Sequence, residues 1–91
     1  MTPLSWSLAV AGPVGRVISR LPAKVAVAVL DFLVGPLLEN PHRVGKALRG
    51  DLAGLHVARV GAYRVIYEIE VEARRVRVLL VEHRADVYRP R

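Results

Sequence analysis

A two-residue turn between two strand-like runs constrains the fold of this chain more than any other stretch of its sequence. The turn, Gly61-Ala62, separates residues 55–60 from residues 63–70, and hydrophobic side chains alternate cleanly along the second run. Such alternation is typical of a β-strand with one face in the core. Glycine in the first central position fits a type II′ turn, which requires a positive φ there. The segment therefore predicts a β-hairpin with a defined register.

The register of this hairpin pairs Val60 with Tyr63 and places Arg59 opposite Arg64. The following pairs are Ala58 with Val65 and Val57 with Ile66. The alternating hydrophobic residues share the face of Val60, so that face is the core and both arginines point to the other face. Like charges in directly opposed positions normally destabilise a sheet, so the arrangement indicates an anionic ligand. The alternatives are that both side chains splay into solvent, or that a bulge shifts the register by one residue and separates them.

The other elements are predicted from chain breaks and hydrophobic spacing, and they complete one domain over residues 1–91. A short strand is expected over residues 5–11, helical turns over 14–21, a helix over 23–34 and a last strand over 76–81. The last strand has a nearly continuous apolar run, which predicts a central position with both faces buried. The order is β-α-α-β-β-β, an α+β fold with a four-stranded antiparallel sheet packed with two N-terminal helices.

The helix expected over residues 23–34 is hydrophobic nearly all round. Its inner stripe is predicted to consist of Ala26, Val29, Leu30 and Leu33, which recur at spacings of three and four residues. The opposite side also has little polarity, and a domain this small cannot easily bury a helix on both sides by itself. Either the first helix or another protein chain is therefore expected to cover it.

The charge of the chain favours an anionic partner. Fourteen basic against eight acidic residues give a net charge of +6, and twelve of the fourteen are arginine. Guanidinium groups bind phosphate through two parallel hydrogen bonds, which favours a polyanion or an acidic protein. The alternative is a basic surface that serves solubility. The chain has no cysteine, which excludes disulfides and thiolate metal sites and suits the cytoplasm. Its longest apolar stretch, residues 25–38, contains Asp31 and is shorter than the ~20 residues of a membrane span.

Basic residues gather in a predicted loop, residues 40–51, which carries Lys46 and Arg49 among turn-forming glycines. Loops on a rigid scaffold commonly carry binding residues, although a solvated connector has the same composition. Around the turn at residues 70–75, acidic and basic side chains are expected to pair across the strands as structural or surface charges. These residues are Glu68, Glu70, Glu72, Arg74, Arg75 and Arg77.

The C-terminal segment ends the last strand with His83 and Arg84 and then offers Tyr88. Because the last strand lies beside the hairpin, Arg84 and Tyr88 are expected to approach the arginine face. A tyrosine beside cations can stack on a nucleobase, and its hydroxyl can act as an acid or base. His56 lies on the core face in this register, so it is interpreted as half-buried rather than as a base, unless a bulge brings it round.

Three stretches of the sequence resemble the RelE/ParE superfamily of toxin–antitoxin toxins. They are RLPAKVAVAVLDFL, NPHRVGKALRGDLAGLHVARVGAYRVIYEI and VEHRADVYR, and together they run over nearly the whole chain. The resemblance implies a four-stranded antiparallel sheet under two helices, and a RelB-like antitoxin that wraps the toxin in a hetero-oligomer. For the RelE branch it implies a cytoplasmic, ribosome-dependent mRNA endoribonuclease (an mRNA interferase) that inhibits translation. In that branch the ribose 2′-hydroxyl attacks the adjacent phosphate of mRNA in the ribosomal A site, without a metal or other cofactor.

The resemblance also implies roles for individual residues. The positions that it marks as catalytic are Arg59, Arg64, Arg84 and Tyr88. The arginines would stabilise phosphate charge, and the tyrosine would stack on the base or assist proton transfer. The expected RNA-binding residues are Lys46, Arg49, His83 and His56. The chain departs from the family pattern at Val57, where a second basic residue is expected in the first hairpin strand. That departure leaves the general base unassigned.

Two other functions fit the same fold. One is a ParE-like toxin that inhibits DNA gyrase, since both branches share the YRVIY and His-Arg stretches. The other is a catalytically weak relative that only binds its antitoxin and co-represses its operon, which the missing basic residue supports. Tyr88 and the surrounding arginines favour the nuclease.

Overall fold

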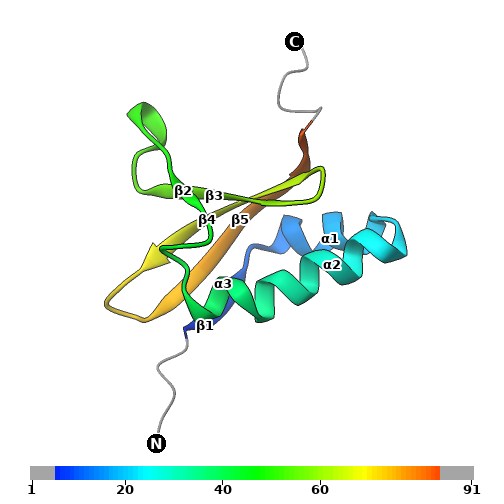
Figure 1. The fold of residues 1–91 in the computed structure, drawn as a ribbon, viewed down its shortest axis with the longest axis horizontal. Helices are drawn as coiled ribbons and strands as arrows, with labels where there is room; N and C mark the ends of the chain where they lie inside the picture. Colours follow the sequence, from blue (N-terminus) through cyan, green and yellow to red (C-terminus); the bar gives the residue numbers. More distant parts are fainter. Residues whose placement is uncertain (1–5, 85–91) are drawn as a thin grey trace, which may run out of the picture.

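The computed structural model describes residues 6–84, which form a five-stranded mixed sheet with helices on one side (Figure 1). The elements follow the predicted order, with a short α-helix, a short strand and a 3-10 helix added before the hairpin. They are β1 (Ser7–Val10), α1 (Gly12–Arg20), α2 (Ala23–Val34), α3 (Pro36–Glu39), β2 (Lys46–Ala47), the 3-10 helix η1 (Gly50–Leu52), β3 (Leu55–Val60), β4 (Tyr63–Glu70) and β5 (Arg75–His83).

The strands lie in the order β1-β5-β4-β3-β2. β1 runs parallel to β5, with Ser7 opposite Arg75 and Val10 opposite Val78, whereas all other neighbours are antiparallel. The prediction of a four-stranded antiparallel sheet is therefore wrong in the number of strands and in the direction of one pairing. β2 has only two residues, too few for an alternating pattern, and the pairing of β1 with β5 joins segments far apart in the chain. Neither feature has a local signal in the sequence.

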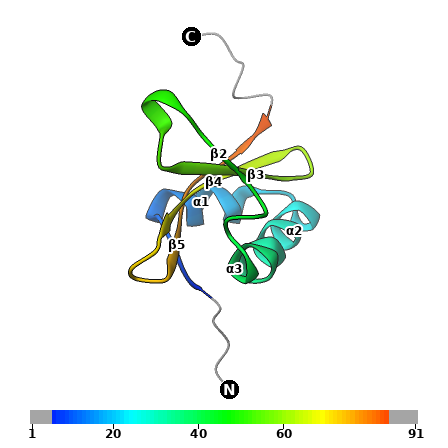
Figure 2. The same cartoon turned by 60° about the vertical axis from the view of Figure 1, so that its left-hand side comes forward.

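The helices α1, α2 and α3 pack against one face of the sheet, which we call the helix-side face (Figures 1 and 2). The other face, which we call the open face, has none of these three helices over it. β5 has a neighbour on each edge, as predicted for a central strand, but Leu80 is 39% exposed on the open face. The prediction that both faces of this strand are buried is wrong, because the helices supply only one covering layer. The core residues are Val14, Ile18, Val29, Leu33, Leu37, Ala58, Val65, Tyr67, Val76, Val78 and Val81.

The β3–β4 hairpin has the predicted register. Its pairs are Val60 with Tyr63, Arg59 with Arg64, Ala58 with Val65 and Val57 with Ile66. Gly61 has a φ of +60°, which a type II′ turn requires at its first central position. The irregularity in the sheet falls instead between Ile66 and Tyr67, where β4 pairs with β5. It lies on the other edge of β4 and leaves the two arginines opposite each other.

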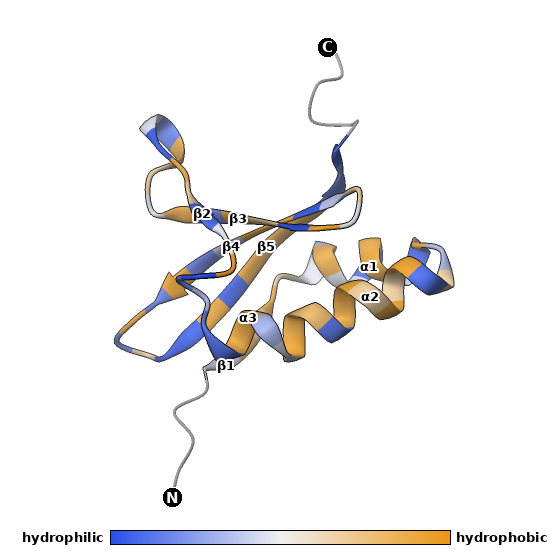
Figure 3. Cartoon of the chain, viewed as in Figure 1, coloured by the Kyte–Doolittle hydropathy of each residue, from blue (hydrophilic) through white to orange (hydrophobic). Residues whose placement is uncertain are grey.

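α2 covers the predicted residues and turns three of the four predicted inner residues to the core, with Ala26 packed against it. Val29 and Leu33 are buried, as predicted, whereas Leu30 is 47% exposed. Leu30 lies on the surface with Val27 and Val34, and we call these three residues the exposed α2 stripe. The ribbon of α2 is coloured as hydrophobic along most of its length (Figure 3). Since both sides of the helix are similarly apolar, the sequence could not decide which side faces the sheet. Within residues 6–84, no helix has the length and apolarity needed to cross a membrane.

The connection between the helices and the hairpin crosses from the helix layer to the edge of the sheet. It was predicted as a loop over residues 40–51, but it contains the strand β2 and the turn η1. Where it passes β3, Lys46 lies opposite Val57 and Ala47 opposite His56. The segment between β2 and β3 then projects from the sheet edge on the side away from the helices (green in Figures 1 and 2).

Candidate nucleic-acid interface

The open face of the hairpin carries two arginines side by side. Arg59 on β3 and Arg64 on β4 are cross-strand partners, and Glu82 on β5 is the next residue in the same row. Arg59 is exposed and Arg64 is half-buried. Directly opposed residues have Cβ atoms about 5 Å apart, so both guanidinium groups can reach one anion. This arginine pair is the centre of the candidate site.

A groove of about 680 Å³ lies between the hairpin and the segment that leads into β2. We call it the basic groove, and it is lined by Arg43, Val44, Gly45, Lys46, Val57, Ala58, Arg59 and Arg64. Four of these residues are cations, and the part of the chain that the structure describes contributes no carboxylate to the lining. Clustered positive charges in a concave surface attract polyanions such as nucleic acid.

Strand β2 brings cations of the connection to the hairpin. Lys46 is the partner of Val57, which lies two residues before Arg59, so Lys46 and Arg59 share the open face. The residue before Lys46 must be small. At Gly45, a Cβ atom would overlap the hydroxyl of Tyr67 and lie 2.8 Å from the Val57 carbonyl oxygen. The chain therefore passes in close contact with β3 just before it delivers Lys46 to the groove.

Sequence reasoning did not select Arg43, which also lines the basic groove. A tight turn places it there: the backbone N–H groups of Arg43 and Val44 donate to the carbonyl of Asn40 at 3.1 and 3.3 Å. The segment has no helical or strand-like periodicity, so its direction could not be predicted. The Asn-Pro pair at residues 40–41 is the turn signal that could have indicated it.

Three of the predicted site residues, Arg59, Arg64 and Lys46, meet in the basic groove. Arg84 follows β5, where its backbone N–H donates a 2.8 Å hydrogen bond to a carbonyl of the hairpin turn. It therefore lies at the same end of the sheet as the arginine pair. Arg49 lies between β2 and η1 and is not part of the groove lining.

The remaining predicted residues lie elsewhere. The ring of His83 packs edge-on against Tyr63, with 5.0 Å between ring centroids, and the two residues are cross-strand partners on the helix-side face. His83 therefore faces away from the groove, which does not fit the expected RNA contact. Tyr88 lies outside the described residues, so its role stays a prediction.

His56 lies on the helix-side face, as its predicted register required. Its ring stacks on Tyr67 with 5.5 Å between centroids, and among the described residues its buried Nδ1 atom has no hydrogen-bond partner. Burial, and then the neighbouring His42, lower the pKa of His56. His56 thus lies on the side away from the groove, which does not fit a role in RNA binding.

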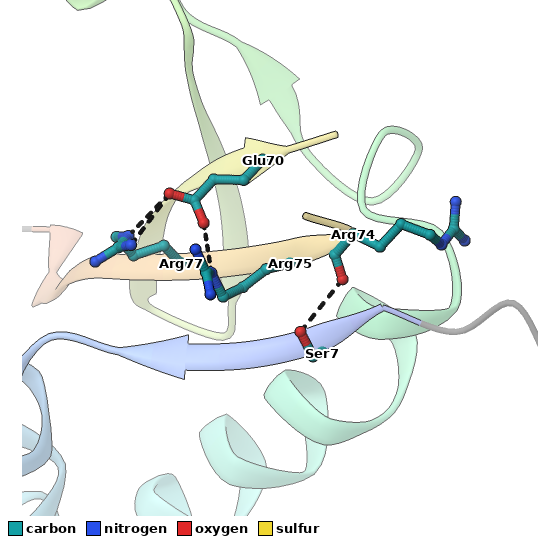
Figure 4. A network of polar contacts seen from close by, with 5 residues as sticks. All are labelled: Ser7, Glu70, Arg74, Arg75 and Arg77. Carbon is teal, nitrogen blue, oxygen red and sulfur yellow. Dashed lines mark hydrogen bonds and ion pairs between the residues drawn. The ribbon is translucent and has the colours of Figure 1, made fainter. Parts of the chain in front are cut away.

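The far end of the open face, at the turn between β4 and β5, also carries arginines. The Nε atom of Arg75 lies 2.5 Å from one carboxylate oxygen of Glu70, and Nη2 of Arg77 lies 3.1 Å from the other (Figure 4). The hydrogen bond from Arg75 and the two positive charges lower the pKa of Glu70. Arg74 instead lies over the ring of Trp6, 4.5 Å from its centroid. The pairing of Arg75 and Arg77 with Glu70 is as predicted for this turn, whereas the contact of Arg74 with Trp6 was not predicted.

Comparison with known proteins identifies the class of protein that this fold defines. Residues 15–88 match the family described as the ParE toxin of the type II toxin–antitoxin system parDE. The chain is 46% identical to Toxin RelE of Mycobacterium tuberculosis over 84 residues, covering 92% of this chain and 87% of the relative. It is 47% identical to Toxin RelG of the same organism over 74 residues, covering 81% and 85%. The chain therefore belongs to the RelE/ParE family of toxins from type II toxin–antitoxin systems.

Solved structures agree with this membership. A chain of the toxin–antitoxin complex RelBE2 from Mycobacterium tuberculosis has a TM-score of 0.84 at 40% identity, with 90% of this chain and 94% of that chain covered. The isolated E. coli RelE toxin has a TM-score of 0.74 at 23% identity, with 87% and 84% covered, and supports the fold alone. The RelE-like fold predicted from the sequence is confirmed, with the fifth strand as its correction.

Proposed function

We propose that this toxin is a ribosome-dependent mRNA endoribonuclease of the RelE type, acting in the cytoplasm on mRNA in the ribosomal A site. The observation that carries the proposal is the cross-strand pair Arg59 and Arg64 at the wall of a groove with four cations and no carboxylate among its described lining residues. Such a site binds a phosphate backbone and stabilises additional negative charge on it. The 46% identity to Toxin RelE supports this branch.

The proposed reaction is an internal transfer at phosphorus. The ribose 2′-oxygen forms a bond to the adjacent phosphorus and loses its proton, while the bond from phosphorus to the 5′-oxygen breaks and that oxygen gains a proton. The products are a 2′,3′-cyclic phosphate and a 5′-hydroxyl end, and no bond is formed to the protein. Charge accumulates on the phosphoryl oxygens in the transition state, where Arg59 and Arg64 would bind it most strongly. Arg84 and Tyr88 are proposed to complete the site. Tyr88 would stack on the nucleobase or assist proton transfer.

We further propose that a RelB-like antitoxin binds and neutralises this toxin. A similar solved structure at 40% identity comes from a toxin–antitoxin complex, RelBE2 of Mycobacterium tuberculosis. The exposed α2 stripe supports a protein partner, because its three side chains are 47–63% exposed and apolar. The positive groove supports a partner with acidic residues.

A gyrase-inhibiting toxin of the ParE type is the second candidate, because the matching family description is that of a ParE toxin. The described lining of the basic groove also has no histidine or carboxylate that could act as a general base. The same observation supports the third candidate, a weak relative that only binds antitoxin and represses its operon.

The test is a map of mRNA 5′ ends in cells after brief induction of the wild-type toxin, Arg64→Ala and Arg77→Ala. Arg77 is the matched control, because it lies on the same face of the sheet but outside the groove. The nuclease hypothesis predicts new mRNA cuts within translated codons for the wild type and Arg77→Ala, and no new cuts for Arg64→Ala. Growth arrest with intact transcripts would assign the gyrase-type function instead, and no arrest would assign the antitoxin-binding relative.

A further inference from the structure

The basic groove is assembled from two segments of the chain, which the backbone pairing of β2 with β3 joins at Lys46 and Ala47, after the turn that carries Arg43. Arg59 and Arg64 belong to the hairpin, whereas Arg43 and Lys46 belong to the connection that crosses the sheet edge. We propose that the buried hydroxyl of Tyr67 is the positioning group that fixes the second segment against the first. The effect on RNA rests on the proposed function, whereas the anchoring itself does not.

The hydroxyl of Tyr67 bonds one end of the connecting segment. Tyr67 is fully buried on the helix-side face of β4, and its hydroxyl donates a 2.7 Å hydrogen bond to the carbonyl of Pro41. Pro41 is itself fully buried, so this carbonyl has little access to water as a replacement donor. Burial raises the pKa of Tyr67 to about 12, so the hydroxyl keeps the proton that it donates.

The same hydroxyl contacts the other end of the segment at Gly45, whose missing side chain leaves the space that the oxygen fills. Pro41 and Gly45 enclose the turn that carries Arg43, and Lys46 follows directly. One oxygen atom thus touches the chain on both sides of Arg43. Tyr67 does not line the groove, so its influence on any ligand must pass through this segment.

The ring of Tyr67 is held in place by a row of aromatic contacts. His56 stacks on Tyr67 at an interplanar angle of 22°. The ring of His42 lies edge-on to His56 with 6.4 Å between centroids, and that of Trp6 lies edge-on to His42 at 5.6 Å. His42 belongs to the connecting segment, so the row ties that segment to the sheet a second time. The loss of the hydroxyl should therefore loosen the segment without unfolding the sheet.

Tyr67→Phe tests the inference, because it removes only the oxygen atom. Tyr63→Phe is the matched control, since it removes a hydroxyl from the same strand at the end away from Pro41. In the free protein, the backbone amides of Arg43 and Val44 should exchange with solvent about tenfold faster in Tyr67→Phe, as expected for the loss of a fixed hydrogen bond. Amides of β4 and β5 should be unchanged, and so should all of these amides in Tyr63→Phe.

A second measurement is the salt dependence of binding to a single-stranded RNA oligonucleotide. The slope of log K against log salt should become shallower by about 0.7 in Tyr67→Phe, because Arg43 no longer holds a fixed position while β2 still holds Lys46 beside β3. If the Tyr67 hydroxyl served only the stability of the fold, the salt slope of the folded Tyr67→Phe protein would equal that of the wild type. The variant Arg43→Ala gives the reference value for the loss of this contact.

Gly45→Ala probes the same contact from the other side, and it covers the case in which Tyr67→Phe does not fold. Its new methyl group should accelerate amide exchange at Arg43 and Val44. In the double variant with Tyr67→Phe, the acceleration should be smaller than the sum of the two single effects, because the tyrosine oxygen no longer occupies the space of the methyl group. Unchanged exchange in either foldable single variant would overturn the inference. A wild-type protein with no RNA binding at any salt concentration, but with the expected exchange pattern, would instead count against the proposed function and leave the anchor supported.

Discussion

The two ends of the open face carry arginines in opposite arrangements. At the turn between β4 and β5, Arg75 and Arg77 both contact the carboxylate of Glu70. At the hairpin tip, Arg59 lies opposite Arg64, and the basic groove adds two further cations. At the first end, both arginines share one carboxylate partner. The second end places like charges in directly opposed positions, where each pair costs a few tenths of a kcal/mol to about 1 kcal/mol.

This contrast separates arginines that pair with a carboxylate at a turn from arginines that line the basic groove. The far end follows the rule that opposite charges pair across strands, so it needs no ligand to supply a negative charge. The hairpin tip breaks that rule, and local rules of stability are broken most often at functional sites. A bound phosphate would supply the negative charge that the groove lining lacks. Three substitutions test this contrast.

The largest expected effect comes from removing the central arginine of the hairpin. Arg64→Ala should reduce mRNA cleavage in a reconstituted translation reaction by about 100- to 1,000-fold, because one charge-stabilising donor of the transition state is lost. Arg77→Ala should stay within about twofold of the wild type, as expected of a group that meets no transition-state charge. Equal losses of cleavage in the two variants would show that the two ends of the open face do not differ in function.

Arg59→Glu converts the hairpin tip into an arrangement like that of the far end. The new carboxylate faces Arg64, so the free energy of unfolding should rise by about 0.5 to 1 kcal/mol in urea titrations. Cleavage should fall at the same time, because the anion site now contains its own anion. Arg59→Gln removes the repulsion without adding attraction, so its free energy of unfolding should lie between those of the wild type and Arg59→Glu. A loss of stability in Arg59→Glu would mean that the opposed arginines do not repel each other in the folded protein.

The smallest effect is expected from Glu70→Gln, which removes the counter-charge of Arg75 and Arg77 at the far end. The pKa of Glu70 is lowered in the folded protein, so its stabilisation is complete above the ordinary carboxyl range and is lost as pH falls through the lowered pKa. The wild type should be slightly more stable than Glu70→Gln at pH 7, and the two urea midpoints should converge in acid. The exposure of both arginines keeps the effect small. A constant difference between the midpoints at every pH would contradict the assignment to ionised Glu70.

Much of the hairpin could be predicted because its determinants are local. Gly61 fixes the turn, the turn fixes the register, and the register places Arg59 opposite Arg64. The core-side position of His56 follows from the same alternation. The pairing of Glu70 with arginines across the next turn was equally predictable, because the partners are close in the sequence.

The features that were missed depend on contacts between distant segments. Arg43 joins the groove only because a turn and the hydroxyl of Tyr67 direct the connection along the edge of β3. Leu30 is exposed because the packing of the helix layer, and not the periodicity of α2, selects which apolar side meets the sheet.

The sequence by itself determined the hairpin, the opposed arginines and the RelE/ParE family, because each is encoded in neighbouring residues that fix backbone geometry or form a recognisable string. The tertiary structure decided the fifth strand, the parallel pairing of β1 with β5 and the second half of the basic groove. These features arise when segments far apart in the chain compete for the same edge or face of the sheet. The outcome of that competition is set by packing, which no local pattern records.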